Sequence, residues 1–171
     1  MNGDDQAFYG KYRGVVSDTK DPLTIGRVKA RVPDVFGDEE CGWAMPCAPF
    51  GGKGMGFFAL PSVGAGVWIE FEGGDPEYPI WSGCWWGAAS EMPPKLLAPP
   101  PPSKRVMLKT EGGHTFVLDD TPGTGGITLE TAQGQKIIMN AQGIEVNDGQ
   151  GGVIKLAGPK VSINNGALEV I

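Results

Sequence analysis

The sequence predicts an all-β protein, and three of its properties lead to this fold class. First, 28 glycines and 15 prolines among 171 residues favour frequent tight turns and disfavour long helices. Second, apolar and polar residues alternate with a period of two over short runs, which is typical of strands with one dry face. Third, glycine, asparagine, aspartate and proline separate these runs at short intervals, as turns between strands require.

Composition divides the chain into three segments. Residues 1–91 contain the longer, aromatic-rich apolar runs and are predicted to form one domain. Residues 92–103, MPPKLLAPPPPS, contain six prolines and are predicted to be a linker. Residues 104–171 are repetitive and are predicted to form a second domain.

The first segment is predicted to contain five short strands. The clearest is the second, because Val28, Ala30 and Val32 alternate with three basic residues and so define a buried and a wet face. Turn residues, such as those of GGDPEYP (73–79), bound the strands. Five short antiparallel strands suit a small barrel of the OB-fold type. The expected strands are 10–18, 26–34, 42–49, 67–72 and 79–86.

The proline-rich linker is predicted to be extended. Pro99 to Pro102 are consecutive and favour the polyproline II conformation, at about 3.1 Å per residue. Such a segment is expected to be neither helix nor central strand. We interpret it as a stiff strap between the domains. A ligand for an SH3-type partner is the alternative, and the position between two ordered segments disfavours it.

The third segment repeats a pair of apolar residues at positions i and i+2. Polar residues stand between and beside the pair members, so each arm has one dry and one wet face. Two further strands are expected upstream, at 104–110 and 114–120. The apolar pairs are Ile127/Leu129, Ile137/Met139, Ile144/Val146, Ile154/Leu156, Val161/Ile163 and Leu168/Val170.

These pairs predict self-association. A single flat meander would leave the whole apolar face in water, and each buried aliphatic side chain is worth about 1.5–3 kcal/mol. A single-chain β-helix would have about two coils, and at least three repeats are usually needed to close a core. Three copies can instead point their dry faces at a common axis. The sequence therefore predicts an intertwined trimeric β-helix or β-prism with the twelve paired residues as its trimer core.

The C-terminal end is predicted to bind a partner. The chain stops within ALEVI without a polar cap, and bare strand ends invite further pairing. Leu168, Val170 and Ile171 are the expected binding residues for a separate tip protein. A frayed terminus or a truncated chain is the alternative interpretation of the same residues.

Several functional classes are disfavoured by composition. The net charge of −6 without a basic patch argues against nucleic acid as a partner. Apolar runs are too short for a membrane helix, and the acidic N-terminus does not resemble a secretory signal. The three cysteines, Cys41, Cys47 and Cys84, lack C-x-x-C spacing and are expected to be reduced and buried. No cofactor or metal is expected.

No catalytic set can be assembled from the sequence. His114 follows Gly112-Gly113 and is expected to be a turn residue. Neighbouring carboxylates on a strand face opposite ways, so they do not form an acid/base pair. Gly51 to Gly54 lack the GxxxxGK[ST] pattern of a phosphate loop and are interpreted as a flexible barrel loop. Trp81, Trp85 and Trp86 are candidates for a stacking platform, for barrel core or for a subunit interface.

Several runs resemble the spike proteins of contractile-tailed phages, of the baseplate assembly protein V type, and the similar spikes of type VI secretion. The runs are YRGVVSDTKDP, GRVKARVPD, WAMPCAPFGG and, most specifically, PSVGAGVWIEFEGGDPEYP from Pro61 to Pro79. The resemblance covers about 10–87 by motif and 104–171 by architecture. It implies an N-terminal OB-fold domain followed by a triple-stranded β-helix.

The resemblance also implies partners and a location. It implies a homotrimer with a separate trimeric hub protein at the OB-fold end and a PAAR-like protein at the tip. It implies transient contact with the outer membrane of a target cell, and a place in a virion tail baseplate or an injection particle assembled in the host cytoplasm. The proline linker stands where some relatives carry a lysozyme domain, so no peptidoglycan cleavage is expected. Some spikes bind a metal through H-x-H, and His114 is the only histidine here.

The leading hypothesis is therefore a non-enzymatic, membrane-piercing spike. Its mechanism would be mechanical, because sheath energy is focused on a narrow β-prism. The alternative is an OB-fold binding module for oligosaccharide or nucleic acid on a trimerising stalk. A β-helix enzyme is a second alternative, which turnover of polysaccharide or peptidoglycan would favour.

Overall fold

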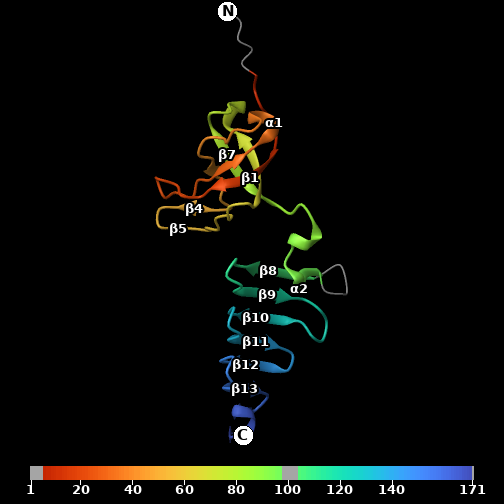
Figure 1. Cartoon of the computed structure of the whole chain (residues 1–171). Coiled ribbons are helices and arrows are strands. Elements are labelled where there is room, and N and C mark those ends of the chain that lie inside the picture. The colour runs from red at the N-terminus through yellow and green to blue at the C-terminus, as the bar shows by residue number, and fades with distance from the viewer. Residues whose placement is uncertain (1–5, 98–103, 171) are drawn as a thin grey trace, which may run out of the picture. The chain divides into compact units, whose positions relative to one another are not determined.

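The computed structural model describes residues 6–97 and 104–170 (Figure 1). The chain divides into two compact units, Met1–Ala88 and Ala89–Ile171, called unit 1 and unit 2 below. Strands form most of the regular structure of both units, and the helices are single turns. The predicted all-β class is therefore confirmed.

Unit 1 is built on a curled five-stranded sheet with the order β2-β1-β6-β7-β3. Neighbouring strands are antiparallel except β3, which runs parallel to β7. Its two edges meet again, because the amide of Ala44 donates to the Val28 carbonyl (2.8 Å) and the Val28 amide donates back (3.2 Å). The sheet thus closes into the expected barrel. The strands are β1 (Tyr12–Asp18), β2 (Lys29–Arg31), β3 (Met45–Pro46), β6 (Gly66–Phe71) and β7 (Pro79–Trp85).

Short elements connect these strands. A one-turn helix, α1 (Pro33–Phe36), follows β2, and a 3₁₀ turn, η1 (Glu72–Gly74), follows β6. The glycine-rich segment expected to be a barrel loop forms a hairpin of β4 (Gly51–Gly52) and β5 (Met55–Gly56). The next element after this hairpin is strand β6, so the hairpin lacks the helix that a phosphate loop requires.

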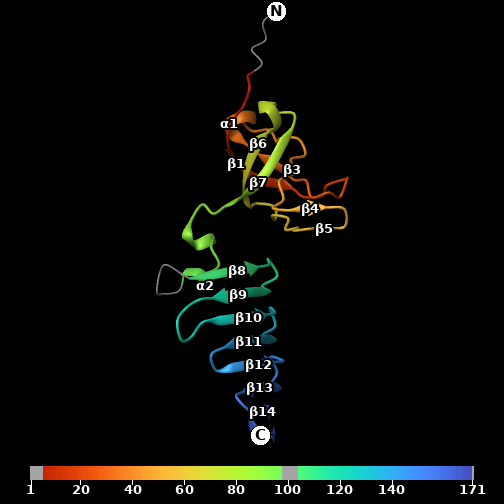
Figure 2. The same ribbon diagram turned by 180° about the vertical axis from the view of Figure 1, so that it is seen from behind.

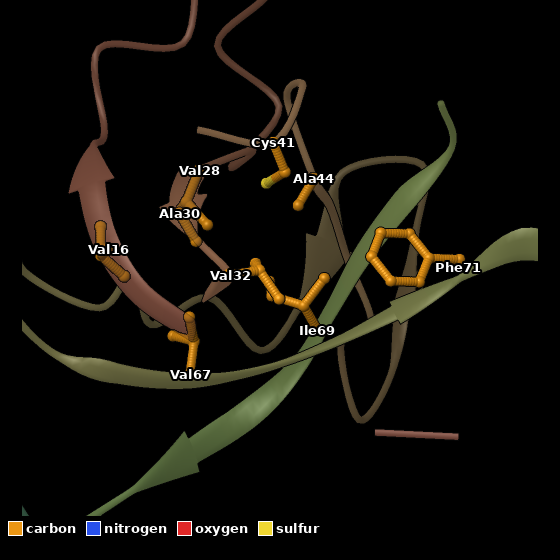
Figure 3. Packing of buried hydrophobic residues seen from close by; sticks show 9 residues of the cluster. All are labelled: Val16, Val28, Ala30, Val32, Cys41, Ala44, Val67, Ile69 and Phe71. Atoms are coloured by element: carbon orange, nitrogen blue, oxygen red, sulfur yellow. The ribbon is translucent and has the colours of Figure 1, made fainter. Parts of the chain in front are cut away.

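The core of unit 1 lies inside the barrel (Figure 3). The alternation in the second strand is confirmed, because Val28, Ala30 and Val32 are fully buried. Val67 and Ile69 of β6 are buried against them. The inward-facing apolar side chains of the barrel are thus buried within one chain.

The cysteines differ from expectation. Cys41 is buried in the core, as predicted, whereas Cys47 and Cys84 are exposed and all three are free thiols. The prediction of three buried thiols is therefore wrong for two of them. The reason is local: Cys47 follows the short strand β3 at the barrel surface, and Cys84 lies near the end of β7.

A buried ion pair shapes the loop before β2. Asp21 contacts the Arg27 guanidinium at 2.6 Å and accepts hydrogen bonds from the amides of Leu23 and Ile25. The hydrogen bond from Arg27 is the main reason that the pKa of Asp21 lies well below its usual range. The loop in turn presents the Gly26 carbonyl to the indole N–H of Trp81, at 3.0 Å.

Unit 2 is one antiparallel meander of eight strands in chain order, β8 to β15. Figures 1 and 2 show its strands stacked one after another, with each arm pairing with the next. A 3₁₀ turn, η3 (Asn164–Gly166), precedes the last strand. The strands are β8 (Arg105–Lys109), β9 (Thr115–Asp119), β10 (Gly126–Glu130), β11 (Lys136–Asn140), β12 (Gly143–Asn147), β13 (Val153–Ala157), β14 (Lys160–Ile163) and β15 (Leu168–Val170).

Two short helical turns precede the meander. They are η2 (Ala89–Glu91) and α2 (Pro94–Leu97), and α2 lies within the segment expected to be extended. The exclusion of helix there is therefore wrong for these four residues, because a proline at the first position of a helix needs no amide partner. Pro99 to Pro102 lie outside the described residues. The predicted domain limits at 91 and 104 stay predictions.

Candidate functional site

The main candidate site is one face of the meander of unit 2, which carries two unbroken rows of apolar side chains. Residues directly opposite each other in an antiparallel ladder share a face, as do residues i and i+2. Ladder A consists of Leu108, Phe116, Leu129, Ile137, Val146, Ile154, Ile163 and Leu168. Ladder B consists of Val106, Leu118, Ile127, Met139, Ile144, Leu156, Val161 and Val170.

All twelve residues predicted as trimer core belong to these ladders. The structure therefore brings them together on one surface, and whether a trimer buries them stays a proposal. Four ladder residues were missed by the prediction: Val106 and Leu108 of β8, and Phe116 and Leu118 of β9. The same i, i+2 spacing in the two upstream strands would have identified them.

The ladder face is open to solvent in the single chain. Twelve of its side chains are between 37% and 69% exposed, Met139 being the least and Val106 the most exposed. Contiguous apolar surface of this kind marks an interaction site in a soluble protein. The ladder face is therefore the candidate interaction surface of unit 2.

Ladder A also forms the floor of a groove. The groove has a volume of about 800 Å³ and follows Leu129, Ile137, Val146, Ile154 and Ile163 across five strands. Side chains of the turns at the same sheet edge form its wall, among them those of Thr131, Gln135 and Asp148. The ladder face is thus concave on one side, so it can receive the edge of another molecule.

The opposite face of the meander is different. Glu145 and Lys155 face each other across β12 and β13 and form an ion pair at 3.7 Å. Nearer β8, Lys95 of α2 binds Glu130 on this face at 2.5 Å. Val117 of β9, which lies on this face opposite Thr128 of β10, is only 7% exposed. The chain therefore covers or hydrates this face by itself and leaves the ladder face for a partner.

Charged hydrogen bonds fasten the first strand of the meander. Arg105 donates from Nε to Asp119 at 2.6 Å and from Nη1 to the Lys95 carbonyl at 2.7 Å. Hydrogen bonds from Thr121 and then from Arg105 lower the pKa of Asp119 to about 2. This pair joins β8, β9 and the α2 segment where the meander begins.

The predicted tip residues lie on the last strand. Leu168 and Val170 of β15 are 55% and 60% exposed and end the two ladders. Ile171 lies outside the described residues. Binding of a tip protein to these residues stays a prediction.

The three tryptophans of β7 and its end have separate surroundings. Trp81 packs against the core, whereas Trp85 donates to the Val67 carbonyl at 3.1 Å. The Arg13 guanidinium lies 5.3 Å from the centre of the Trp85 ring. Trp86 is 59% exposed. Trp81 and Trp85 are therefore tied to the barrel, which leaves Trp86 as the freely presented side chain of the three.

Other candidate chemistry is sparse. His114 is exposed next to the 110–113 turn, and its amide donates to Thr110 Oγ1 at 3.1 Å, as expected of a turn residue. Across residues 6–97 and 104–170, no group of three metal-ligating side chains is close enough to hold an ion. Within the same ranges, no helix has the length and apolar character needed to cross a membrane.

Comparison with known families identifies both units. Residues 12–86 match the model of the type VI secretion system/phage-baseplate injector OB domain. Residues 105–169 match the model of the phage baseplate V C-terminal trimerisation domain. The chain belongs to the phage baseplate V family. The predicted OB-fold and the resemblance to baseplate and type VI spikes are thereby confirmed.

Membership in the baseplate V family gives the ladder face its context. All ladder residues except Val170 lie inside the segment that matches a trimerisation domain, which supports a homotrimer. The chain is also similar to the type VI secretion system spike protein VgrG4b of Pseudomonas aeruginosa, with 31% identity over 106 residues. That match covers 61% of this chain and 12% of the relative, so the chain spans about an eighth of the length of that protein.

The family match bears on the functional class as well. The matched domains are those of baseplate and type VI injection proteins, which supports a structural role for this chain. A non-enzymatic role agrees with that family.

Proposed function

We propose that this chain is the central spike of a contractile injection baseplate, a homotrimeric needle that pierces the target membrane. The observation that carries the proposal is the pair of open apolar ladders on one face of a meander of eight strands. Three such faces turned toward a common axis form a three-sided prism in which each copy supplies one side. Every ladder side chain then leaves water.

The shape that follows suits mechanical work. Strands of a sheet lie about 4.8 Å apart, so the meander of unit 2 is a rod about 40 Å long. Each interior strand is hydrogen-bonded to both neighbours, which resists bending. The ion-paired residues Glu145 and Lys155 face outward in this arrangement and give the rod a hydrated polar surface. A narrow rigid rod concentrates the force of a contracting sheath on a small area of membrane.

The proposed partners rest on the resemblance to baseplate and type VI spikes and on the exposed apolar residues of β15. The proposal places a trimeric hub protein against unit 1 and a PAAR-like tip protein against three copies of β15. Leu168 and Val170 would supply the apolar contacts to the tip protein. The working location is a tail baseplate or a related injection particle, and the target is the outer membrane of another cell.

Two adjacent isoleucines of β11 test the assignment of the faces. Ile137 belongs to ladder A and is 39% exposed, whereas Ile138 points to the opposite face and is partly buried. A trimer with inward ladders predicts that I137D leaves only monomers, since three carboxylates would lie near one axis. I138D should keep the trimer. Native mass spectrometry of the two full-length variants separates the outcomes.

If the protein were a monomer, the two variants would rank in the opposite order by their loss of stability. Without a trimer, I138D would be the more harmful change, because Ile138 is the more sheltered side chain. A trimeric I137D protein would therefore refute the inward ladders. Particles assembled with I137D should also lose injection of the target cell, while the sheath still contracts.

A further inference from the structure

Unit 1 carries an apolar groove that its own core does not explain. The groove has a volume of about 680 Å³ and lies between the β4–β5 hairpin and β7. Phe50, Met55, Phe57 and Phe58 line it and are between 46% and 74% exposed. Side chains of this size are normally buried, and several together on one surface mark an interface.

The lining of the groove is uncharged. None of the described residues that line it is an aspartate, glutamate, lysine, arginine or histidine. Lys53 occupies the turn of the hairpin and is not among them. Contact with this surface therefore requires no desolvation of a charge, which is otherwise the main cost of burying a protein surface.

The hairpin is also open to close approach. A side-chain carbon placed on Gly51 or Gly54 would have no neighbouring atom within 4 Å. The glycines thus leave bare backbone beside the apolar side chains, where another molecule can pack closely.

We propose that this groove binds unit 1 of a neighbouring copy, as a second homotypic interface of the trimer. The inference rests on the proposed trimer. The segment between β7 and β8 runs from 86 to 104 and reaches at most about 65 Å, at about 3.4 Å per residue. When three copies of unit 1 are tethered within that radius, the effective concentration of each copy near the others is about 1 mM. Even a weak contact between them is then populated.

The charge distribution favours a second copy of this chain as the occupant of the groove. Each copy has a net charge of −6, so most of its surface repels another copy. An uncharged apolar groove is where two like-charged molecules can meet at the smallest electrostatic cost. The three-fold symmetry of the trimer makes such a contact head-to-tail, with each groove occupied by the next copy.

Two native thiols report on the groove. Cys47 and Cys84 line it and are exposed in the single chain, whereas Cys41 lies in the barrel core. Partial desolvation by the surrounding atoms raises the pKa of the Cys84 thiol. Labelling rates are therefore compared for the same thiol between variants. The reagent is a maleimide, and the labelled peptides are quantified by mass spectrometry.

The experiment uses three forms of the full-length chain without any other protein. In the wild-type trimer, Cys47 and Cys84 should react at least about tenfold more slowly than in M55D, which places a carboxylate in the groove. M55D should remain trimeric through unit 2, because Met55 is 68% exposed and carries no core packing. V63D is the matched control, since Val63 is 61% exposed and lies outside the groove, and its thiols should stay protected.

The monomeric I137D variant completes the design. Its two groove thiols should label as fast as those of M55D, which would show that protection comes from another copy. Protection that persists in I137D would come from within the chain and would overturn the inference. Rapid labelling of both thiols in a wild-type protein of trimeric mass would overturn it too, and would leave the proposed spike intact. Failure of the wild type to form a trimer would instead defeat the proposed function.

Discussion

The two units of this chain are built from the same kind of alternating strands, yet they treat their apolar residues in opposite ways. In unit 1, Val28, Ala30, Val32, Val67 and Ile69 have no exposed surface at all. In unit 2, only Val117 and Val153 are buried among the described residues, and neither belongs to a ladder. One unit has a core of its own and the other has a core that must be completed.

Topology explains this difference. In unit 1, the bridge between Val28 and Ala44 joins the sheet edges, so the inner faces of the strands look at one another. In unit 2, every strand pairs only with its neighbours in the chain, and the register keeps the apolar residues on one side. A barrel buries its dry face by curvature, whereas an open meander buries its dry face by association.

The largest expected effect comes from shortening a ladder side chain. Ile154 is 42% exposed in the single chain, so an account based on one copy expects I154A to cost about 1 kcal/mol or less. If the trimer buries Ile154, I154A should lower the free energy of unfolding by about 2–5 kcal/mol per copy, and all three copies contribute to the trimer. Circular dichroism melting over a dilution series should show a lower midpoint that falls further with dilution.

The control for I154A is its neighbour on the other face. K155A removes only the exposed ion pair to Glu145, which is worth about 0–1 kcal/mol. Equal destabilisation by the two variants would contradict the distinction between the faces.

A smaller effect is expected for the matching change in unit 1. I69A opens a cavity in a core that belongs to one chain, and it should lower the free energy of unfolding of unit 1 by about 2–5 kcal/mol, once per copy. Its unfolding should be independent of protein concentration, and the trimeric mass should be unchanged. Loss of the trimer in I69A would mean that the two units do not have separate cores.

The smallest expected effect is the response to acid. Asp21 and Asp119 have pKa values below that of an unfolded aspartate, about 3.9. Each therefore stabilises its unit fully above that value and loses the contribution as the pH falls toward the folded pKa. Unfolding monitored between about pH 5 and pH 2 should show less pH dependence for D21N in unit 1 and for D119N in unit 2. An unchanged pH profile in both variants would refute the contribution of these two carboxylates to stability.

The sequence predicted those parts of the fold that alternation encodes. Val28, Ala30 and Val32 were identified as a buried row because three basic residues separate them, and the ladder pairs were found in the same way. The hairpin at Gly51–Gly56 was not foreseen, because four glycines in six residues carry no alternation. The parallel pairing of β3 with β7 was also not foreseen, since it depends on contacts distant in sequence.

The site was predictable for the same reason and to the same extent. Pairs such as Ile144 and Val146 were recognisable from local spacing, but their alignment into two continuous ladders depends on register. The exposed positions of Cys47 and Cys84 were not predictable, because cysteine is commonly a buried residue and neither thiol lies in an alternating run. The groove of unit 1 is formed by segments distant in sequence and only the fold reveals it.

Sedimentation equilibrium of the purified full-length chain at micromolar concentration tests the central claim most directly. The account predicts a single species with three times the 18.0 kDa mass of the chain, about 54 kDa. A soluble, fully folded species of 18.0 kDa would show that the ladder face is stable in water, and would contradict the account.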